Sequence, residues 1–363
     1  MRGMDMPAAF GQRKGRGAAS NDSGRFEAEK RVAFDDGWGT ADEEPMPLQT
    51  TLSVDATRTI IARNDSPDIG FDRSINPYRG CEHGCIYCYA RPSHAYLGLS
   101  PGLDFESRLF YKPQAAKLLA AELSKKGYVC RPIALGSNTD PYQPVERKLG
   151  ITRAILEVLR EFRHPVTIVT KSALIQRDLD ILGEMASDRL AMAAVSITTL
   201  DRRLARVMEP RAATPERRLQ TIAALAAAGV PAAVMSAPMI PALNDSEMEQ
   251  ILERARAAGA TSAAYTLLRL PLELKDLFKE WLEAHFPAKA AHVLSLVAQT
   301  HGGRLYDSTW FKRKTGAGPY ADVLRLRFER ACRKLGFNER TTQPLDTSRF
   351  SPPPQTGDQL ALF

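Results

Sequence analysis

The feature that most constrains the fold is a repeated alternation of short apolar runs and longer helical stretches between residues 74 and 271. The runs are four to six residues long and apolar on both faces. This pattern is typical of strands in a sheet that is covered by helices. We expect such strands near residues 74–78, 132–135, 166–169, 192–197, 232–235 and 263–268.

Helix signals mark the stretches between these strands. Thr214 and Pro215 provide an N-cap and a first helical position, and the helix that they begin is expected to end at Gly229. Helices over residues 113–126 and 245–258 are likewise followed by glycine. The result is about six strand–helix units, which predicts parallel strands joined by right-handed crossovers.

These units predict an α/β fold, specifically a partial (β/α)6 TIM-like barrel with a helical C-terminal extension and disordered termini. A closed eight-fold barrel typically needs about 250 residues, whereas residues 74–271 provide roughly 200. A doubly wound parallel sheet is the alternative. In either fold, the functional site is expected at the C-terminal ends of the strands.

Composition divides the chain into four segments. Residues 1–60 are predicted to be disordered or loosely structured, because their first three quarters are rich in Gly, Ala, Ser, Asp and Arg and lack apolar periodicity. Residues 61–300 form the predicted core domain, residues 301–340 a basic extension, and residues 341–363 a disordered tail. In residues 301–350, 11 Lys and Arg stand against 5 Asp and Glu, so most of the net charge of +7 lies there.

The overall composition excludes several classes of protein. Of 363 residues, 44% are hydrophobic and 25% are charged, which is the balance of a soluble globular protein. No apolar run approaches the roughly 20 residues that a membrane-spanning helix needs, and the N-terminus lacks a signal-peptide core. Five cysteines are too few for a secreted disulfide scaffold. We therefore expect a cytoplasmic protein without a membrane partner.

Three of the five cysteines lie within eight positions, directly after the first predicted strand: Cys81, Cys85 and Cys88. Three thiolates can bind three irons of a cubane cluster and leave the fourth iron open, much as catalytic zinc keeps an open position. Gly80 and Gly84 would let the loop wrap closely around the metal.

A structural zinc site is the alternative for these cysteines. The triplet could be completed by His83 or His94, although no second close pair of ligands follows. The two other cysteines, Cys130 and Cys332, are isolated in the sequence and are expected to be inert thiols.

The spacing C-x3-C-x-aromatic-C resembles the signature of the radical S-adenosylmethionine (SAM) superfamily. The resemblance implies that Cys81, Cys85 and Cys88 bind a [4Fe–4S] cluster and that SAM binds its fourth iron. It further implies reductive cleavage of SAM to a 5′-deoxyadenosyl radical, a partial (β/α)6 barrel, and a reductant such as flavodoxin or ferredoxin as partner.

Further motifs resemble the branch of this superfamily that is related to spore photolyase. They are Asn76-Pro77-Tyr78-Arg79-Gly80-Cys81, Cys88-Tyr89-Ala90-Arg91, Asn138-Thr139-Asp140-Pro141 and Val169-Thr170-Lys171. The resemblance implies that Tyr87 lies beside the adenine of SAM and that Lys171 reaches its carboxylate. The other cofactor-binding residues that it implies are Tyr89, Asn138, Thr139, Asp140 and Ser196.

One position departs from that branch. Spore photolyase returns a hydrogen atom to the repaired thymine from a cysteine, and the corresponding residue here is Ser137. The O–H bond of serine is too strong for a comparable hydrogen donor. This departure argues against repair of spore photoproduct itself.

Two C-terminal features favour a nucleic-acid partner. Residues 310–314 interleave aromatic and basic side chains, which can stack on bases and bind phosphates. The last residues, Gln359-Leu360-Ala361-Leu362-Phe363, resemble the peptide by which bacterial repair proteins dock onto the DNA sliding clamp.

We therefore expect a radical SAM enzyme that acts on damaged or modified DNA. An enzyme of the same chemistry that modifies RNA or protein is the second hypothesis. A zinc-stabilised nucleic-acid-binding module without catalysis is the third.

Overall fold

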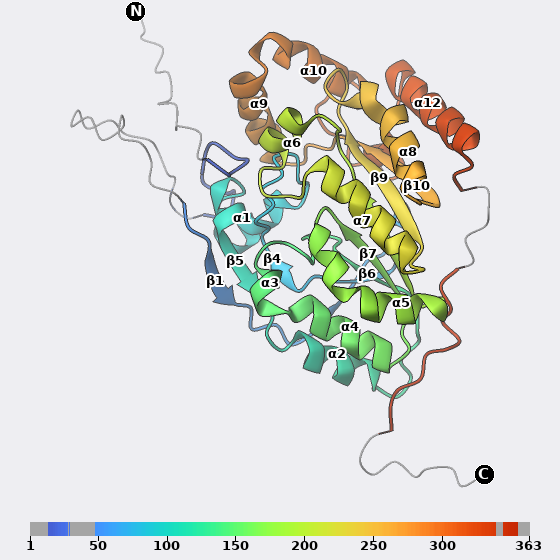
Figure 1. Ribbon diagram of the computed structural model, residues 1–363. Coiled ribbons are helices and arrows are strands. Elements are labelled where there is room, and N and C mark those ends of the chain that lie inside the picture. Colours follow the sequence, from blue (N-terminus) through green and yellow to red (C-terminus); the bar gives the residue numbers. More distant parts are fainter. Residues whose placement is uncertain (1–13, 28, 30–47, 339–343, 355–363) are drawn as a thin grey trace, which may run out of the picture.

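The computed structural model describes residues 14–27, 29, 48–338 and 344–354. Among these residues, seven strands form a sheet of order β10-β9-β8-β7-β6-β3-β2 (Figure 1). The strands are β2 (Ile61–Arg63), β3 (Arg73–Ile75), β6 (Ile133–Leu135), β7 (Val166–Thr170), β8 (Ala191–Ser196), β9 (Ala232–Met239) and β10 (Ser262–Leu267).

Six of the strands in this described sheet, β3 and β6 to β10, are parallel, and each lies beside the next one along the chain. β2 pairs with β3 in the antiparallel direction and forms one edge. Since β10 forms the opposite edge, the strands described do not close into a complete barrel. The predicted α/β class with six parallel strands is thus confirmed.

Helices cover one face of this sheet (Figure 1). They are α2 (Ala115–Leu123), α4 (Ile151–Glu161), α5 (Leu179–Ser187), α7 (Pro215–Ala227) and α8 (Met248–Ala257). α7 begins as predicted, because the Thr214 hydroxyl accepts a hydrogen bond from the Arg217 amide. In α4, Ile155, Leu156 and Leu159 are fully buried, and burial of each such side chain contributes about 1.5–3 kcal/mol.

The C-terminal part adds α9 (Leu274–His285), α10 (Pro287–Thr300), α11 (Lys312–Thr315) and α12 (Pro319–Leu335). The apolar side of α9 packs against the cysteine loop, since Phe278 and Trp281 share one buried cluster with Ile86 and Met208. Met208 ends α6 (Arg202–Met208). The helical extension therefore contributes to the core beneath the cysteines.

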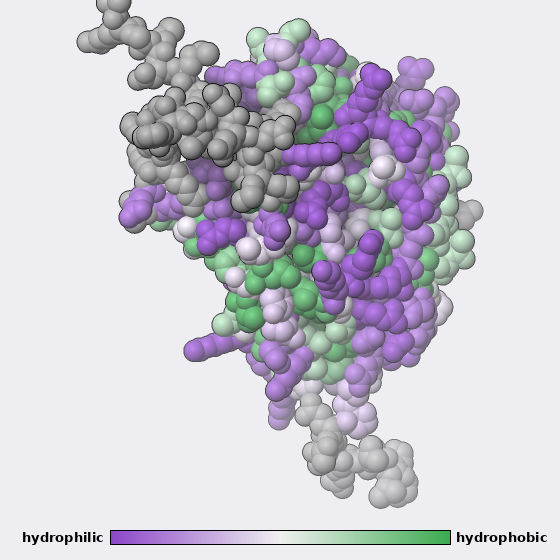
Figure 2. Space-filling view, turned by 60° about the vertical axis from the view of Figure 1, so that its left-hand side comes forward, coloured by the Kyte–Doolittle hydropathy of each residue, from purple (hydrophilic) through white to green (hydrophobic). Residues whose placement is uncertain are grey.

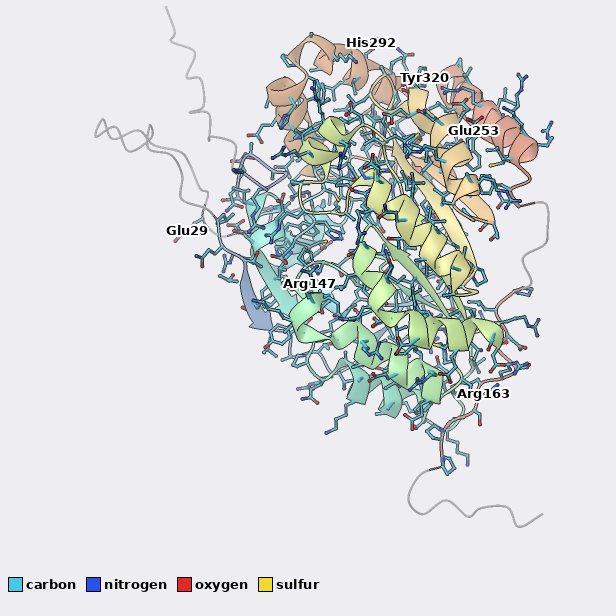
Figure 3. The ribbon with its side chains drawn as sticks, viewed as in Figure 1. Glu29, Arg147, Arg163, Glu253, His292 and Tyr320 are labelled. Carbon is cyan, nitrogen blue, oxygen red and sulfur yellow. The ribbon has the colours of Figure 1, made fainter. Side chains whose placement is uncertain are left out.

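A smaller sheet in the described chain adjoins the cysteine loop. It contains β1 (Thr51–Val54), β5 (Arg108–Tyr111) and β4 (Tyr78–Arg79), which directly precedes the loop. Figure 2 shows one face of the molecule, on which most side chains are hydrophilic and apolar groups gather toward the middle. Charged side chains such as Arg147 on α3 (Glu146–Leu149) and Glu253 on α8 project outward (Figure 3).

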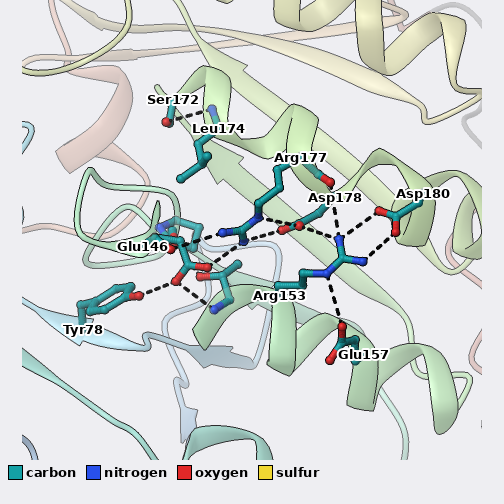
Figure 4. A network of polar contacts seen from close by, with 11 residues as sticks. Tyr78, Glu146, Arg153, Glu157, Ser172, Leu174, Arg177, Asp178 and Asp180 are labelled. Carbon is teal, nitrogen blue, oxygen red and sulfur yellow. Dashed lines mark hydrogen bonds and ion pairs between the residues drawn. The ribbon is translucent and has the colours of Figure 1, made fainter. Parts of the chain in front are cut away.

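A buried polar network ties β4 to the helices (Figure 4). The Glu146 carboxylate, fully buried, accepts hydrogen bonds from the Tyr78 hydroxyl, from Arg177 at 2.8 Å and from the Thr152 amide at 3.0 Å. Arg177 also contacts the buried Asp178 at 2.8 Å. Because these charges are paired and hydrogen-bonded, the network fixes the position of β4 and of the cysteine loop that follows it.

Two terminal stretches expected to be loosely structured make defined contacts. In residues 14–27, the Gly17 and Ala18 amides donate to the Glu106 carboxylate at 2.9 Å each. In residues 344–354, Asp346 forms an ion pair with Arg189. Small residues with little apolar periodicity can thus be ordered by long-range partners. The terminal peptide 359–363 lies outside the described residues, so its clamp-binding role stays a prediction.

No helix among the described residues is long and apolar enough to span a membrane.

Candidate active site

A cavity of about 680 Å³ lies at the carboxyl ends of the parallel strands. Its volume is in the usual range for small-molecule sites. The loop after β6 contributes Gly136 to Asp140, and β7, β8 and β9 contribute residues at or near their ends. All ten predicted site residues are described and line this cavity: Cys81, Cys85, Cys88, Tyr87, Tyr89, Asn138, Thr139, Asp140, Lys171 and Ser196.

One buried guanidinium group is hydrogen-bonded to the backbone of the cysteine loop. Arg91 is fully buried and donates to the carbonyls of Gly84 and Cys85 at 3.1 and 2.9 Å. It also forms a buried ion pair with Glu106. Since backbone carbonyls are the acceptors, Arg91 fixes the path of the loop rather than one side chain.

A side chain at Gly84 would strain this loop. Its φ is +66°, in the left-handed region, and an added Cβ would lie 2.6 Å from the Glu106 carboxylate. Gln143 also holds the backbone of this loop. Its side chain accepts a hydrogen bond from the Glu82 amide at 2.8 Å and donates one to the Gly80 carbonyl at 3.2 Å. The loop is therefore preformed around its three thiols.

The donor set fits an iron–sulfur cluster. Burial raises the pKa of Cys81 and of Cys85, so their thiolates need a cationic partner such as iron. In the described part of the chain, no three His, Cys, Asp or Glu side chains converge as a single metal ion requires. Thiols around a cubane cluster stand farther apart, because each binds a different iron.

The two histidines considered as zinc ligands have other partners. His83 Nδ1 lies 3.3 Å from an Asp140 carboxylate oxygen, and His94 Nε2 lies 2.9 Å from the Arg108 carbonyl oxygen. Among the described residues, neither histidine converges with the cysteines as a single zinc ion would require.

Asp140 joins the cysteine loop to the end of β7. Its carboxylate accepts from the Lys171 amide at 2.8 Å and from the Thr170 hydroxyl at 2.7 Å, besides contacting His83. Burial opposes ionisation, but His83 and these donors together lower the pKa of Asp140 to about 2. The carboxylate thus positions Lys171, whose ammonium lies 5.6 Å from the centre of the Tyr87 ring.

Tyr87 is anchored by a second buried group. Its hydroxyl contacts Glu209 and lies 3.1 Å from the Thr198 hydroxyl, and Glu209 pairs with the buried Arg218. The ring is therefore held rigidly beside Cys85 and Cys88.

Asn76 organises the loop after β6. Its side-chain oxygen accepts from the amides of Asn138 and Thr139 at 2.9 and 3.3 Å, and its amide group donates to the Ser137 hydroxyl at 3.0 Å. Ser137 also lines the cavity. The structure thus places the predicted residues together, while their contacts with a cofactor stay predictions.

Sequence reasoning missed a second group of cavity residues, which come from the far C-terminal segment and from β10. Tyr306, Arg313 and Lys314 line the cavity, as does Arg269, which follows β10. The basic 310–314 stretch was predicted to bind nucleic acid, but its position beside the cysteines was not. The only available signal for Arg269 is its place after a predicted strand.

Asp68 fixes the C-terminal segment at the cavity. Arg313 Nε donates to its carboxylate at 2.7 Å, and Lys314 Nζ donates to its carbonyl oxygen at 2.8 Å. The hydrogen bond from Arg313 lowers the pKa of Asp68 to about 2.

An Asp68→Asn variant is expected to loosen residues 311–316. Loss of a charged hydrogen bond of about 1.5 kcal/mol would raise amide exchange there about tenfold. Because the folded-state pKa is depressed from 3.8, the pair stabilises the protein above about pH 4 and is lost as the pH falls through about 2. Hydrogen exchange measured by mass spectrometry tests whether residues 311–316 exchange faster in the variant. The exposed neighbour Asp65 provides the control, and equal exchange in Asp68→Asn and Asp65→Asn would contradict the role of the pair.

The parallel sheet has the strand order of a TIM-like α/β fold. At its carboxyl edge lies a loop with three thiols, which is the donor set of an iron–sulfur cluster. The radical SAM superfamily model matches residues 75–255, and these residues are a domain of that superfamily. Its cofactors are a [4Fe–4S] cluster and SAM.

Similar proteins occur in bacteria and archaea. An uncharacterized Mycobacterium tuberculosis protein is 38% identical over 219 residues, which cover 60% of this chain and 64% of the relative. An uncharacterized Methanocaldococcus jannaschii protein is 27% identical over 213 residues, covering 59% and 76%. The chain thus matches less than two thirds of the length of its mycobacterial relative.

The fold is similar to solved structures of spore photoproduct lyase. One, complexed with dinucleoside spore photoproduct, gives a TM-score of 0.56 at 14% identity, covering 79% of this chain and 80% of that chain. A variant of the same enzyme with bound AdoMet and the dinucleoside gives 0.55 at 14% identity with the same coverage. At this identity the likeness concerns the fold alone.

Proposed function

We propose that the protein is a radical SAM enzyme whose substrate is a nucleic acid, in particular damaged or modified DNA. The main support is that one cavity is lined both by the three cysteines and by cationic side chains of the C-terminal segment. The first group suits the cofactors, and the second suits a polyanionic substrate.

Cys81, Cys85 and Cys88 would hold the cluster, with SAM beside it. Bound there, these cofactors supply a 5′-deoxyadenosyl radical and methionine when one electron from a reductant such as flavodoxin or ferredoxin cleaves the sulfonium. Lys171, positioned by Asp140, would bind the carboxylate of SAM. Tyr87, fixed by Glu209, would lie against its adenine. The buried residues around the cysteines would limit the access of water, and the chemistry supplied there would be abstraction of a hydrogen atom from the substrate.

One observation supports DNA as the substrate, and two further points concern how such a substrate would bind and which lesion it would carry. The solved neighbour with the same fold is complexed with a dinucleoside spore photoproduct. The cavity lies at the carboxyl edge of the sheet, so a target base has to be extruded from a duplex to reach it. Ser137 lines the cavity where the related branch has its hydrogen-donating cysteine, which favours a lesion or modification other than spore photoproduct.

The test is cofactor cleavage by the anaerobically reconstituted protein. Reduced protein with SAM is expected to release 5′-deoxyadenosine, and protein without reductant is expected to release none. Single- and double-stranded oligonucleotides deuterated at candidate positions then identify the substrate, because deuterium should appear in 5′-deoxyadenosine. Zinc without iron or sulfide, together with no 5′-deoxyadenosine, would contradict the proposal.

A further inference from the structure

We propose that Arg269 and Lys314 form a subsite for a backbone phosphate of the nucleic acid at the rim of the cavity. This inference rests on the proposed function in taking nucleic acid as the substrate. It adds which two residues bind the chain and which chemical group they recognise.

Arg269 lines the cavity and has no anionic partner among the residues that the structure describes. It follows β10, and its guanidinium lies 4.3 Å from the centre of the Tyr89 ring. The Tyr89 hydroxyl donates to the Ser137 carbonyl, so the ring that supports Arg269 is itself fixed. No carboxylate in the described part of the chain forms an ion pair with Arg269. A planar fork of N–H donors stacked on a ring is suited to a phosphate.

Lys314 is the second cation and is only half-buried. Its ammonium donates to the Asp68 carbonyl oxygen, whereas the Asp68 carboxylate is engaged by Arg313 through both oxygens. Burial lowers the pKa of Lys314, and the nearby charges of Arg269 and Arg313 lower it further, although Asp68 opposes them. Arg269 and Lys314 both line this cavity, so an anion bound between them would offset two like charges on one wall.

The net charge of the cavity lining also favours an anionic ligand. Among described residues, five lining side chains are Lys or Arg: Arg63, Lys171, Arg269, Arg313 and Lys314. The lining carboxylate, Asp140, already contacts His83. Lys171 is assigned to the carboxylate of SAM, and Arg313 pairs with Asp68. Arg63, Arg269 and Lys314 are then the lining cations that an anionic substrate would meet.

A nucleic-acid chain fits the rim better than a small anion. Trp310 and Phe311 precede Lys314 by four and three residues and are 54% and 65% exposed. Phe311 has a φ of +67°, a costly conformation for an aromatic residue that places it at the start of α11. Exposed aromatic rings beside cations are the combination that binds single-stranded nucleic acid by stacking and phosphate contact.

The experiment measures binding of fluorescent ten-residue oligonucleotides to the reconstituted protein by anisotropy across a salt series. The probes are single-stranded DNA, RNA of the same sequence, and an uncharged peptide nucleic acid of the same sequence. Arg269→Gln and Lys314→Gln are each expected to weaken DNA binding about tenfold and to lower the salt slope by about one. Binding of the uncharged probe should not change.

Arg325→Gln is the matched control, because Arg325 is exposed on α12 and pairs with Asp322 and Glu329. Thermal melting of each variant checks its folding, and two separate variants protect against the failure of one.

Equal DNA affinity in Arg269→Gln, Lys314→Gln and Arg325→Gln would overturn the subsite. Wild-type protein that binds the uncharged probe as tightly as DNA, or that binds neither DNA nor RNA, would also overturn it. Tighter binding of RNA than DNA, with the same losses in the variants, would retain the phosphate subsite and assign it to RNA. Cleavage of SAM by wild-type protein is measured without oligonucleotide, so failure of the radical chemistry is seen separately.

Discussion

A Cys85→Ala variant is expected to lose the iron–sulfur absorption and to form 5′-deoxyadenosine only at the uncatalysed background. Cys85 is 7% exposed and lines the cavity with Cys81 and Cys88. Removal of one thiolate leaves an iron without its protein ligand in a buried site, where water cannot replace it well. Iron and sulfide analysis, the absorption spectrum and chromatographic detection of 5′-deoxyadenosine measure the effect.

The control for this variant is Cys130→Ala. Cys130 is half-buried and precedes β6, at the opposite end of that strand from the cavity. This variant should keep the wild-type iron content and cleavage rate. Full cleavage activity in Cys85→Ala would contradict the cluster assignment.

A Glu106→Gln variant is expected to lower the free energy of unfolding by about 3–5 kcal/mol. The fully buried Glu106 carboxylate pairs with the fully buried Arg91 and accepts the Gly17 and Ala18 amides. An amide in its place leaves the Arg91 charge unpaired in the interior, which is costly. Denaturant unfolding, followed by circular dichroism under anaerobic conditions, measures the difference.

An exposed carboxylate serves as the comparison. Glu329→Gln removes an exposed partner of Arg325 and should change the free energy of unfolding by less than about 1 kcal/mol. A Glu106→Gln loss no larger than that of Glu329→Gln would show that the buried pair does not support the cysteine loop.

The sequence predicted the sheet well because its strands are buried on both faces. Short β-branched runs such as 166–169 have no competing helical period, and the observed β7 covers residues 166–170. Since parallel strands end at one edge, residues after separate strands had to meet there. Asp140 and Lys171, 31 residues apart, are accordingly joined by a hydrogen bond of 2.8 Å.

What the sequence did not reveal depends on partners far along the chain. Glu106 holds the amides of Gly17 and Ala18, which come from a segment with the composition of a loose tail. Asp68 and Arg313 are 245 residues apart, and no local pattern specifies their pairing. Periodicity describes which face of an element is buried, whereas such contacts depend on how distant loops meet.

The pairing of Asp68 with Arg313 also has a consequence for the order of folding. The cavity wall joins residues 62–76 with residues 306–314, so it needs nearly the whole described chain. Closing a loop of that length costs entropy that local helices and neighbouring strands do not have to overcome. We expect the six parallel strands to assemble first and the rim of the cavity last. During synthesis, the cysteine loop would therefore be accessible for iron delivery before the rim of the cavity has formed.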